Sequence, residues 1–185
     1  MVYAGIDYSL TSPAVCVYND RDPFQWSSVK AYFLSDIKKT HGNFGNINGN
    51  SFHMYSSDQE RYEGIAKWVL SIIKIYSVEK VFIEGYSYGS TGMVFHIAEN
   101  AGLLKHKLWD QKIDFEVIAP TVIKKTATGK GNASKQLMEQ TFVEQTNVDL
   151  RSILSLTEKQ NNPISDIIDS YYIVMTGVKS VGILV

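Results

Sequence analysis

Cysteine is almost absent from this 185-residue chain, in which Cys16 is the only one. A single cysteine excludes an internal disulfide and a cysteine-cluster zinc site, and it is typical of proteins from a reducing compartment. Long apolar runs are also missing, because no window approaches the roughly 18 consecutive apolar residues that a membrane span requires. Residues 1–6 lack the basic start and apolar core of a secretory signal. We therefore expect a cytoplasmic protein without membrane association.

An excess of charge of one sign is missing as well. Eighteen Lys and Arg residues stand against 19 Asp and Glu residues, so the formal net charge is −1. Any binding to a polyanion must therefore come from local clusters of charge. Hydrophobic residues make up 44% of the chain and charged residues 20%, which excludes a disordered, collagen-like or coiled-coil protein.

Alternation of apolar and polar residues predicts β structure at the beginning of the chain. Residues 2–9 alternate with the period of a strand, and the apolar run 14–18 follows a turn signal, so we expect these segments to pair as a hairpin. A third strand is expected over residues 28–34. The stretch at residues 41–51 is rich in Gly and Asn, which predicts a long mobile loop or a hairpin tip outside the core.

Helical and strand patterns alternate in the remainder of the chain. Apolar residues recur at helical spacing over residues 58–76, and residues 80–86 form a short apolar run typical of a buried strand. The further expected elements are a helix over residues 91–111, a strand over residues 115–119, and helices over residues 132–144 and 163–175. This order predicts an α/β fold with a five-stranded mixed central sheet flanked by helices, in a single domain over residues 1–185.

Two carboxylates stand at the ends of otherwise apolar strands. Glu84 ends one of them, and an ionised carboxylate away from water is costly unless a cation or hydrogen bonds compensate it. The alternative is that Glu84 protrudes past the sheet edge into solvent. Asp7 ends the first strand, and Gly5, two residues before it on the same face, leaves room for a ligand or another backbone.

The last expected helix contributes two further carboxylates. Asp166 and Asp169 are three residues apart, so they lie about 60° from each other on one helix face. An apolar stripe from Ile164 to Met175 lies opposite, which leaves open an amphipathic helix with two solvated aspartates. Ile173 continues the line of the aspartates, however, and a face that is acidic at one end and apolar at the other favours the wall of a cleft.

The four acids Asp7, Glu84, Asp166 and Asp169 form a set of hard oxygen donors. Such donors suit Mg²⁺ or Mn²⁺ and not zinc or copper, and like charges at short range would need cations to stay ionised. With two ions roughly 4 Å apart, such a cluster promotes in-line attack of water on a phosphodiester. We therefore interpret the four acids as candidate metal ligands and catalytic residues.

A basic segment without any acidic residue extends over positions 117–138. Its lysines are Lys124, Lys125, Lys130 and Lys135. Gly129 and Gly131 precede the expected helix, and free backbone amides at such a place bind phosphate oxygens. The segment is not a Walker A loop, so no nucleoside triphosphate is expected. The alternative is a solvated loop before an ordinary helix.

Tyr86 and Tyr88 closely follow Glu84. Aromatic side chains beside a phosphate-binding site stack on exposed bases, typically with about 1–3 kcal/mol per base. Packing in the core or in a turn is the alternative for both.

Four segments, taken together and in this order, resemble the RuvC family of Holliday-junction resolvases within the ribonuclease H-like superfamily. They read GIDYSLTSPAVCV, VFIEGYSYGS, IAPTVIKKTATGKGNASK and NPISDIIDSYYIV. The third is the most specific, with Ala119-Pro120, Lys124, and then Gly129, Gly131 and Lys135 at the family's spacing.

The resemblance implies a homodimeric, magnesium-dependent endodeoxyribonuclease that nicks two opposed strands of a four-way DNA junction. It maps the family's four metal-binding acids onto Asp7, Glu84, Asp166 and Asp169. It also implies two Mg²⁺ ions per site, for which Mn²⁺ could substitute. The basic DNA-contacting positions map onto Lys124 and Lys135.

The chain departs from the family pattern at two places. The family's wedge aromatic lies three residues after the second acid, where this chain has Ser87, so Tyr86 or Tyr88 would have to substitute. The insert at residues 41–51 is longer than the usual connection, as in divergent viral members, which favours a bacteriophage origin and a location in the host cytoplasm.

Other functions stay open at this point. The same site would suit a nuclease for forks, flaps or RNA–DNA hybrids. A junction-binding module without activity is a further alternative, which four intact acids disfavour. The first strand followed by Ser9 and Thr11 loosely resembles the phosphate loop of actin-like or sugar-kinase-like phosphotransferases, but those enzymes need two lobes.

Overall fold

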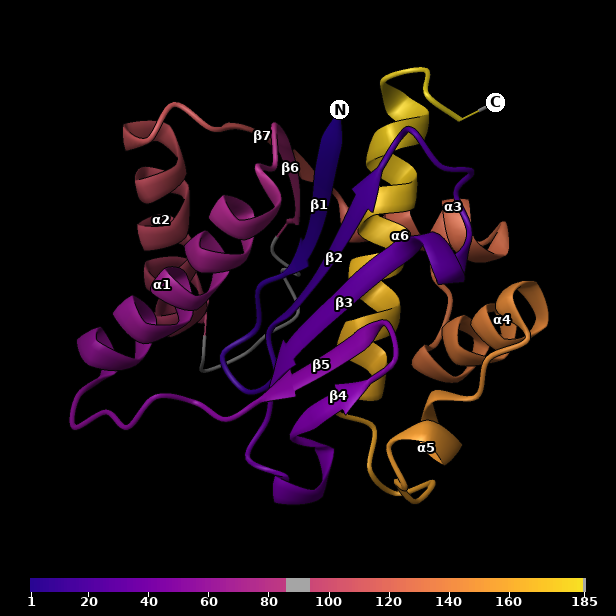
Figure 1. Cartoon of the computed structure of the whole chain (residues 1–185), viewed down its shortest axis with the longest axis horizontal. Coiled ribbons are helices and arrows are strands. Elements are labelled where there is room, and N and C mark those ends of the chain that lie inside the picture. The colour runs from indigo at the N-terminus through magenta and orange to yellow at the C-terminus, as the bar shows by residue number, and fades with distance from the viewer. Residues whose placement is uncertain (86–93, 185) are drawn as a thin grey trace.

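A seven-stranded mixed sheet runs through the molecule, which a computed structural model describes over residues 1–85 and 94–184 (Figure 1). The strands are β1 (Val2–Asp7), β2 (Ala14–Asn19), β3 (Val29–Leu34), β4 (Gly42–Phe44), β5 (Ile47–Asn50), β6 (Lys80–Glu84) and β7 (Asp114–Ile118). They lie in the order β4-β5-β3-β2-β1-β6-β7. The expected hairpin of β1 and β2 is present, and β6 and β7 continue the sheet parallel to β1.

The expected count of five strands is wrong because residues 41–51 form a hairpin, one of the two expected alternatives, and its strands join the edge of the sheet. β5 pairs parallel with β3, and β4 folds back on β5 through a turn in which Gly45 has a φ of 74°. Ile47 is fully buried. A Cβ at Gly49 would lie 1.9 Å from the Thr40 carbonyl oxygen. An edge hairpin needs few apolar residues, so its Gly and Asn content resembles that of a loop.

Helices connect and cover the strands. They are α1 (Asp58–Tyr76), α2 (Val94–Asp110), α3 (Pro120–Thr128), α4 (Lys135–Thr146), the short α5 (Leu150–Ile153) and α6 (Ile164–Ser180), with 3-10 turns at Trp26–Ser28 and Lys38–Thr40. The sequence interpretation missed α3, which begins at a proline and ends at Gly129 in the left-handed conformation. In the described ranges, no helix combines the length and apolar character needed to span a membrane.

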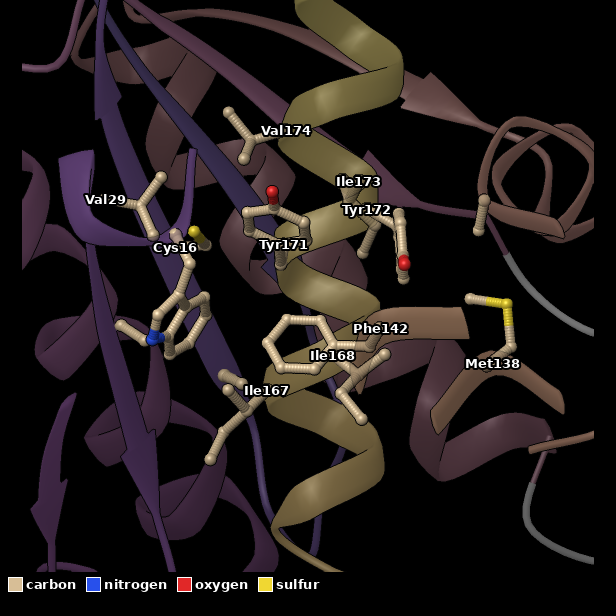
Figure 2. Packing of buried hydrophobic residues seen from close by; sticks show 14 of the residues in the cluster. Cys16, Val29, Met138, Phe142, Ile167, Ile168, Tyr171, Tyr172, Ile173 and Val174 are labelled. Carbon is tan, nitrogen blue, oxygen red and sulfur yellow. The ribbon is translucent and has the colours of Figure 1, made fainter. Parts of the chain in front are cut away.

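The helices form a layer on each face of the sheet, with α1 and α2 on one face and α3, α4 and α6 on the other (Figure 1). Alternate residues of β1 therefore enter two cores, since Tyr3 faces the α6 side while Ala4 and Ile6 face the α1 side. Cys16 is buried on the α6 side (Figure 2).

Helix α6 is buried on nearly all sides, which contradicts the alternative of a plain amphipathic helix with a single apolar stripe. Its residues Ile167 and Val174 belong to the core next to the sheet, and Tyr171 packs against Phe142 of α4 with ring centroids 5.4 Å apart (Figure 2). The sheet covers one side of α6, and α3 and α4 cover another. The helix is therefore fixed in position along its length.

Glycine at position 5 permits the close approach of α6 to β1. A Cβ at Gly5 would lie 2.4 Å from both the Ser170 carbonyl oxygen and the Val174 backbone nitrogen. Of the two expectations for Gly5, a ligand or another backbone, the structure shows another backbone. A second contact of this kind lies at Gly177, where a Cβ would lie 2.2 Å from the ring of Phe82. These contacts hold α6 directly against β1 and β6.

We expect Gly5→Ala to lower the free energy of unfolding by about 1–3 kcal/mol or more, because overpacking at a backbone contact forces the helix away from the strand. Gly102→Ala in α2 is the matched control, because a Cβ there meets nothing within 4 Å. Urea unfolding of both variants measures the effect. Equal stability of the two variants would contradict this account of Gly5.

Candidate active site

Asp7 and Glu84 lie side by side at one edge of the sheet. They end the neighbouring parallel strands β1 and β6, in which Ile6 is paired with Ile83. Parallel strands bring their carboxyl ends to the same edge, so this register places the two carboxylates next to each other. Both side chains are half-buried, and the alternative of a Glu84 that protrudes freely into solvent is wrong.

Asp166 and Asp169 occupy the first two turns of α6. Asp166 is only 5% exposed and Asp169 is half-buried, so the alternative of two solvated aspartates is also wrong. Their burial follows from the position of α6 between the sheet and two helices. Asp166 lies where the free N–H groups of a helix N-terminus stabilise negative charge.

The electrostatic coupling of the four acids shows that the fold brings them together. Burial raises the pKa of Asp7 well above its ordinary value, and the charges of Asp166, Asp169 and Glu84 raise it further. Burial, followed by the charges of Glu84 and Asp166, raises the pKa of Asp169 from 3.8 to about 7. Each of these carboxyl groups therefore lies within electrostatic reach of at least one of the others.

Two of the predicted lysines lie within electrostatic reach of this cluster. Burial raises the pKa of Glu84, while Lys124 of α3 and Lys135 of α4 oppose that shift. Lys135 also donates from Nζ to Ser165 Oγ, 3.3 Å away, in the first turn of α6. Lys125 and Lys130 are exposed on the same segment, and no hydrogen bond or ion pair with the four acids is found for them in the described residues.

A groove of about 940 Å³ extends from the acidic cluster between α4 and α6. Lys135, Ser165 and Asp169 are among its lining residues. A hydrogen bond caps the beginning of α4. Ser134 Oγ, just before the helix, accepts from the Leu137 N–H at 3.1 Å. The cap places Lys135 at the first residue of α4, beside the cluster.

Ser12 contacts the cluster although the sequence interpretation did not include it. It lies in the loop between β1 and β2, and its Oγ donates a hydrogen bond to Asp166 Oδ2 at 2.6 Å. The two residues are 154 positions apart in the chain. No sequence pattern marks a serine five positions after Asp7 as a site residue, so only the packing of α6 against the sheet reveals this contact.

The predicted stacking residues Tyr86 and Tyr88, together with Ser87, lie outside the described residues. Their role as a wedge or as base-stacking groups stays a prediction from the sequence.

The donor chemistry of the cluster fits a divalent cation. All four side chains offer carboxylate oxygens, which Mg²⁺ and Mn²⁺ prefer, and a cation would relieve the repulsion that raises their pKa values. Across residues 1–85 and 94–184, no three His, Cys, Asp or Glu side chains are already arranged as a metal-binding group. The four acids thus fit a cation by their chemistry.

The chain matches the sequence model of a known protein family over most of its length. The sequence model of the family described as crossover junction endodeoxyribonuclease RuvC matches residues 34–176, a range that includes Glu84, Asp166 and Asp169 but not Asp7. No curated protein sequence matches the chain.

Solved structures extend the likeness to nearly the whole chain. Thermus thermophilus RuvC has a TM-score of 0.60 at 21% identity, covering 98% of this chain and 97% of that one. The T. thermophilus RuvC complex with a Holliday junction substrate has a TM-score of 0.59 at 21% identity, covering 95% and 92%. The yeast mitochondrial Holliday junction resolvase Ydc2 has a TM-score of 0.52 at 15% identity, covering 94% and 76%. These likenesses show a ribonuclease H-like fold, as expected.

The raised pKa of Asp169 predicts a pH dependence of stability in the absence of divalent ions. Between about pH 4 and pH 7 the folded chain retains a proton on Asp169 that the unfolded chain releases, so this group lowers the stability of the fold as the pH rises. We therefore expect Asp169→Asn to gain stability relative to the unmodified chain across this range.

Urea unfolding in a chelating buffer, measured at intervals from pH 4 to pH 8, tests this expectation. Asp114→Asn is the control, because it makes the same Asp-to-Asn change at an exposed position. Asp114 lies on β7 and pairs with Lys80 at 3.1 Å. A stability difference between Asp169→Asn and the unmodified chain that stays constant with pH would contradict the prediction.

Proposed function

Because this chain belongs to the RuvC family of crossover junction endodeoxyribonucleases, we propose that it resolves four-way DNA junctions by hydrolysing one phosphodiester in each of two opposed strands. The observation that carries the proposal is the convergence of Asp7, Glu84, Asp166 and Asp169 from β1, β6 and α6. Four mutually repelling carboxylates at a sheet edge have no structural benefit in themselves, and they suit a metal-assisted hydrolase.

Divalent ions are the cofactor of RuvC-type enzymes in general, and Mg²⁺ is the ion we propose here, with Mn²⁺ as a substitute. Two ions held by the four carboxylates would supply positive charge to the scissile phosphate and lower the pKa of the attacking water. The carboxylates would hold these ions from two adjacent strand ends and one helix face. Partial burial of the four side chains lowers the local dielectric constant, which strengthens each electrostatic interaction in the site.

The lysines next to the cluster have a separate role in this proposal. Lys124 and Lys135 lie within electrostatic reach of the acids, and Lys125 and Lys130 are exposed on the same segment. We expect all four to contact phosphates of the DNA backbone. Such contacts position a nucleic acid without reading its sequence.

Cleavage of two opposed strands requires two active sites, so we propose a homodimer. A four-way junction has approximate two-fold symmetry, which a two-fold dimer matches with one active site in each protomer. A monomer at working concentrations would instead favour forks, flaps or RNA–DNA hybrids as substrates. Cleavage measured on a panel of junction, fork, flap, duplex and hybrid substrates decides between them. Membership of the RuvC family disfavours the phosphotransferase alternative.

We expect Asp7→Asn to reduce the rate of cleavage of a synthetic four-way junction in Mg²⁺ by at least about 100-fold, because it removes one charged ligand from the cluster. Junction binding without divalent ions should persist. Asp114 begins β7 and is paired with Lys80 at the beginning of β6, so it lies at the end of the strands away from the four acids, and Asp114→Asn should cleave at the normal rate. Full activity of Asp7→Asn would refute the proposed function. If the unmodified chain binds the junction but does not cleave it in either Mg²⁺ or Mn²⁺, that result would support a non-catalytic module.

Lys124→Ala and Lys135→Ala should each weaken junction binding and reduce the slope of log K against log salt by about 1, since each lysine neutralises one phosphate. Lys74→Ala is the control, because Lys74 is exposed in the last turn of α1. It lies next to the beginning of β6, whereas Glu84 of the acidic cluster lies at the end of that strand. Binding measured by fluorescence anisotropy over a range of salt concentrations gives the slopes. Slopes unchanged in both variants would show that this segment does not contact DNA.

A further inference from the structure

We propose that Ser12 is a positioning residue of the active site, which orients the Asp166 carboxylate toward bound divalent ions through a buried hydrogen bond. The proposal deepens the function proposed above and rests on it. It assigns a role to a side chain from the loop between β1 and β2, a segment that lies outside the residues matched by the family's sequence model.

The geometry of the contact is that of a strong hydrogen bond. Ser12 Oγ lies 2.6 Å from Asp166 Oδ2, within the range of a hydroxyl that donates to an ionised carboxylate. Ser12 is 2% exposed and Asp166 is 5% exposed, so water does not readily replace either partner. The bond therefore restricts the rotation of the Asp166 side chain.

Ser12 is itself held in place by the loop that carries it. Its backbone N–H donates to Ser9 Oγ at 3.0 Å, which closes the loop on itself. The carbonyl oxygen of Leu10 accepts a hydrogen bond from Arg61 Nη2 of α1 at 2.7 Å, which ties the loop to the opposite layer of helices. A rigid donor of this kind is what a precisely oriented ligand needs.

The bond commits one oxygen of Asp166 and leaves the other for a cation. Ser165 Oγ is also near Asp166 Oδ2, but at 3.4 Å, and it lies 3.1 Å from Asn162 Oδ1 as well. Ser12 is therefore the closer partner of Oδ2. Because the loop with Ser12 directly follows Asp7, the contact also fixes the helix ligand Asp166 relative to the strand ligand Asp7. Loss of such outer partners typically costs 10- to 100-fold in metal affinity or activity.

The test compares Ser12→Ala with Ser12→Thr, which retains the hydroxyl. Mn²⁺ binding is measured by calorimetry on each variant, after circular dichroism has shown that it is folded. We expect Ser12→Ala to bind Mn²⁺ about 10- to 100-fold more weakly and to need correspondingly more metal for half-maximal junction cleavage. Junction binding without metal should be unchanged, and Ser12→Thr should restore most of the Mn²⁺ affinity.

Ser35→Ala is the matched control for a purely structural effect. Ser35 is 3% exposed, and its Oγ accepts a hydrogen bond from the Ile37 N–H at 3.0 Å. This variant should bind Mn²⁺ normally. Normal Mn²⁺ affinity in Ser12→Ala, an equal loss in Ser35→Ala, or no recovery in a folded Ser12→Thr would overturn the proposal. An inactive Asp7→Asn together with normal metal binding in Ser12→Ala would refute the role of Ser12 alone, whereas a fully active Asp7→Asn would refute the proposed function.

Discussion

Repulsion among four poorly hydrated carboxylates is the constraint on which the rest of this structure depends. Burial raises the pKa of each group, and neighbouring negative charges raise those of Asp7, Glu84 and Asp169 further. Without cations the cluster opposes folding, so other parts of the chain must hold these side chains together. The same repulsion favours divalent cations, because a bound cation is the largest local charge and reverses the effect.

The hydrophobic core on the α6 side holds the cluster together. Full burial of an aliphatic or aromatic side chain stabilises a fold by about 1.5–3 kcal/mol, and α6 buries several of them. The fully buried ones include Ile167, Tyr172, Ile173, Val174 and Val178. The contact at Gly5 fixes how far α6 approaches β1. The helix turns that carry Asp166 and Asp169 therefore stay near the strand ends despite the repulsion.

The two lysines near the site belong to helices that pack against α6. Lys124 and Lys135 belong to α3 and α4, which pack against α6, so the cations and two of the acids share one layer. Each lysine lowers the pKa of Asp169, but not enough to bring it back to its ordinary value. A chain with a net charge of −1 can thus present a basic segment beside an acidic cluster.

Local patterns in the sequence were sufficient for the positions of β1 and β6, the helix over Asp58–Tyr76 and the spacing of Asp166 and Asp169, because the periods of strands and helices are short. They left open whether residues 41–51 form a loop or a hairpin, and they did not reveal that β4 and β5 join the sheet or that α6 is buried on nearly all sides. They also missed the bond from Ser12 to Asp166. These features depend on contacts between distant segments, such as β5 beside β3 and the backbone of α6 against Gly5. The sequence by itself therefore determined which residues could form the site, and only tertiary packing decided how close they lie, because distances between separate elements are set by the whole core.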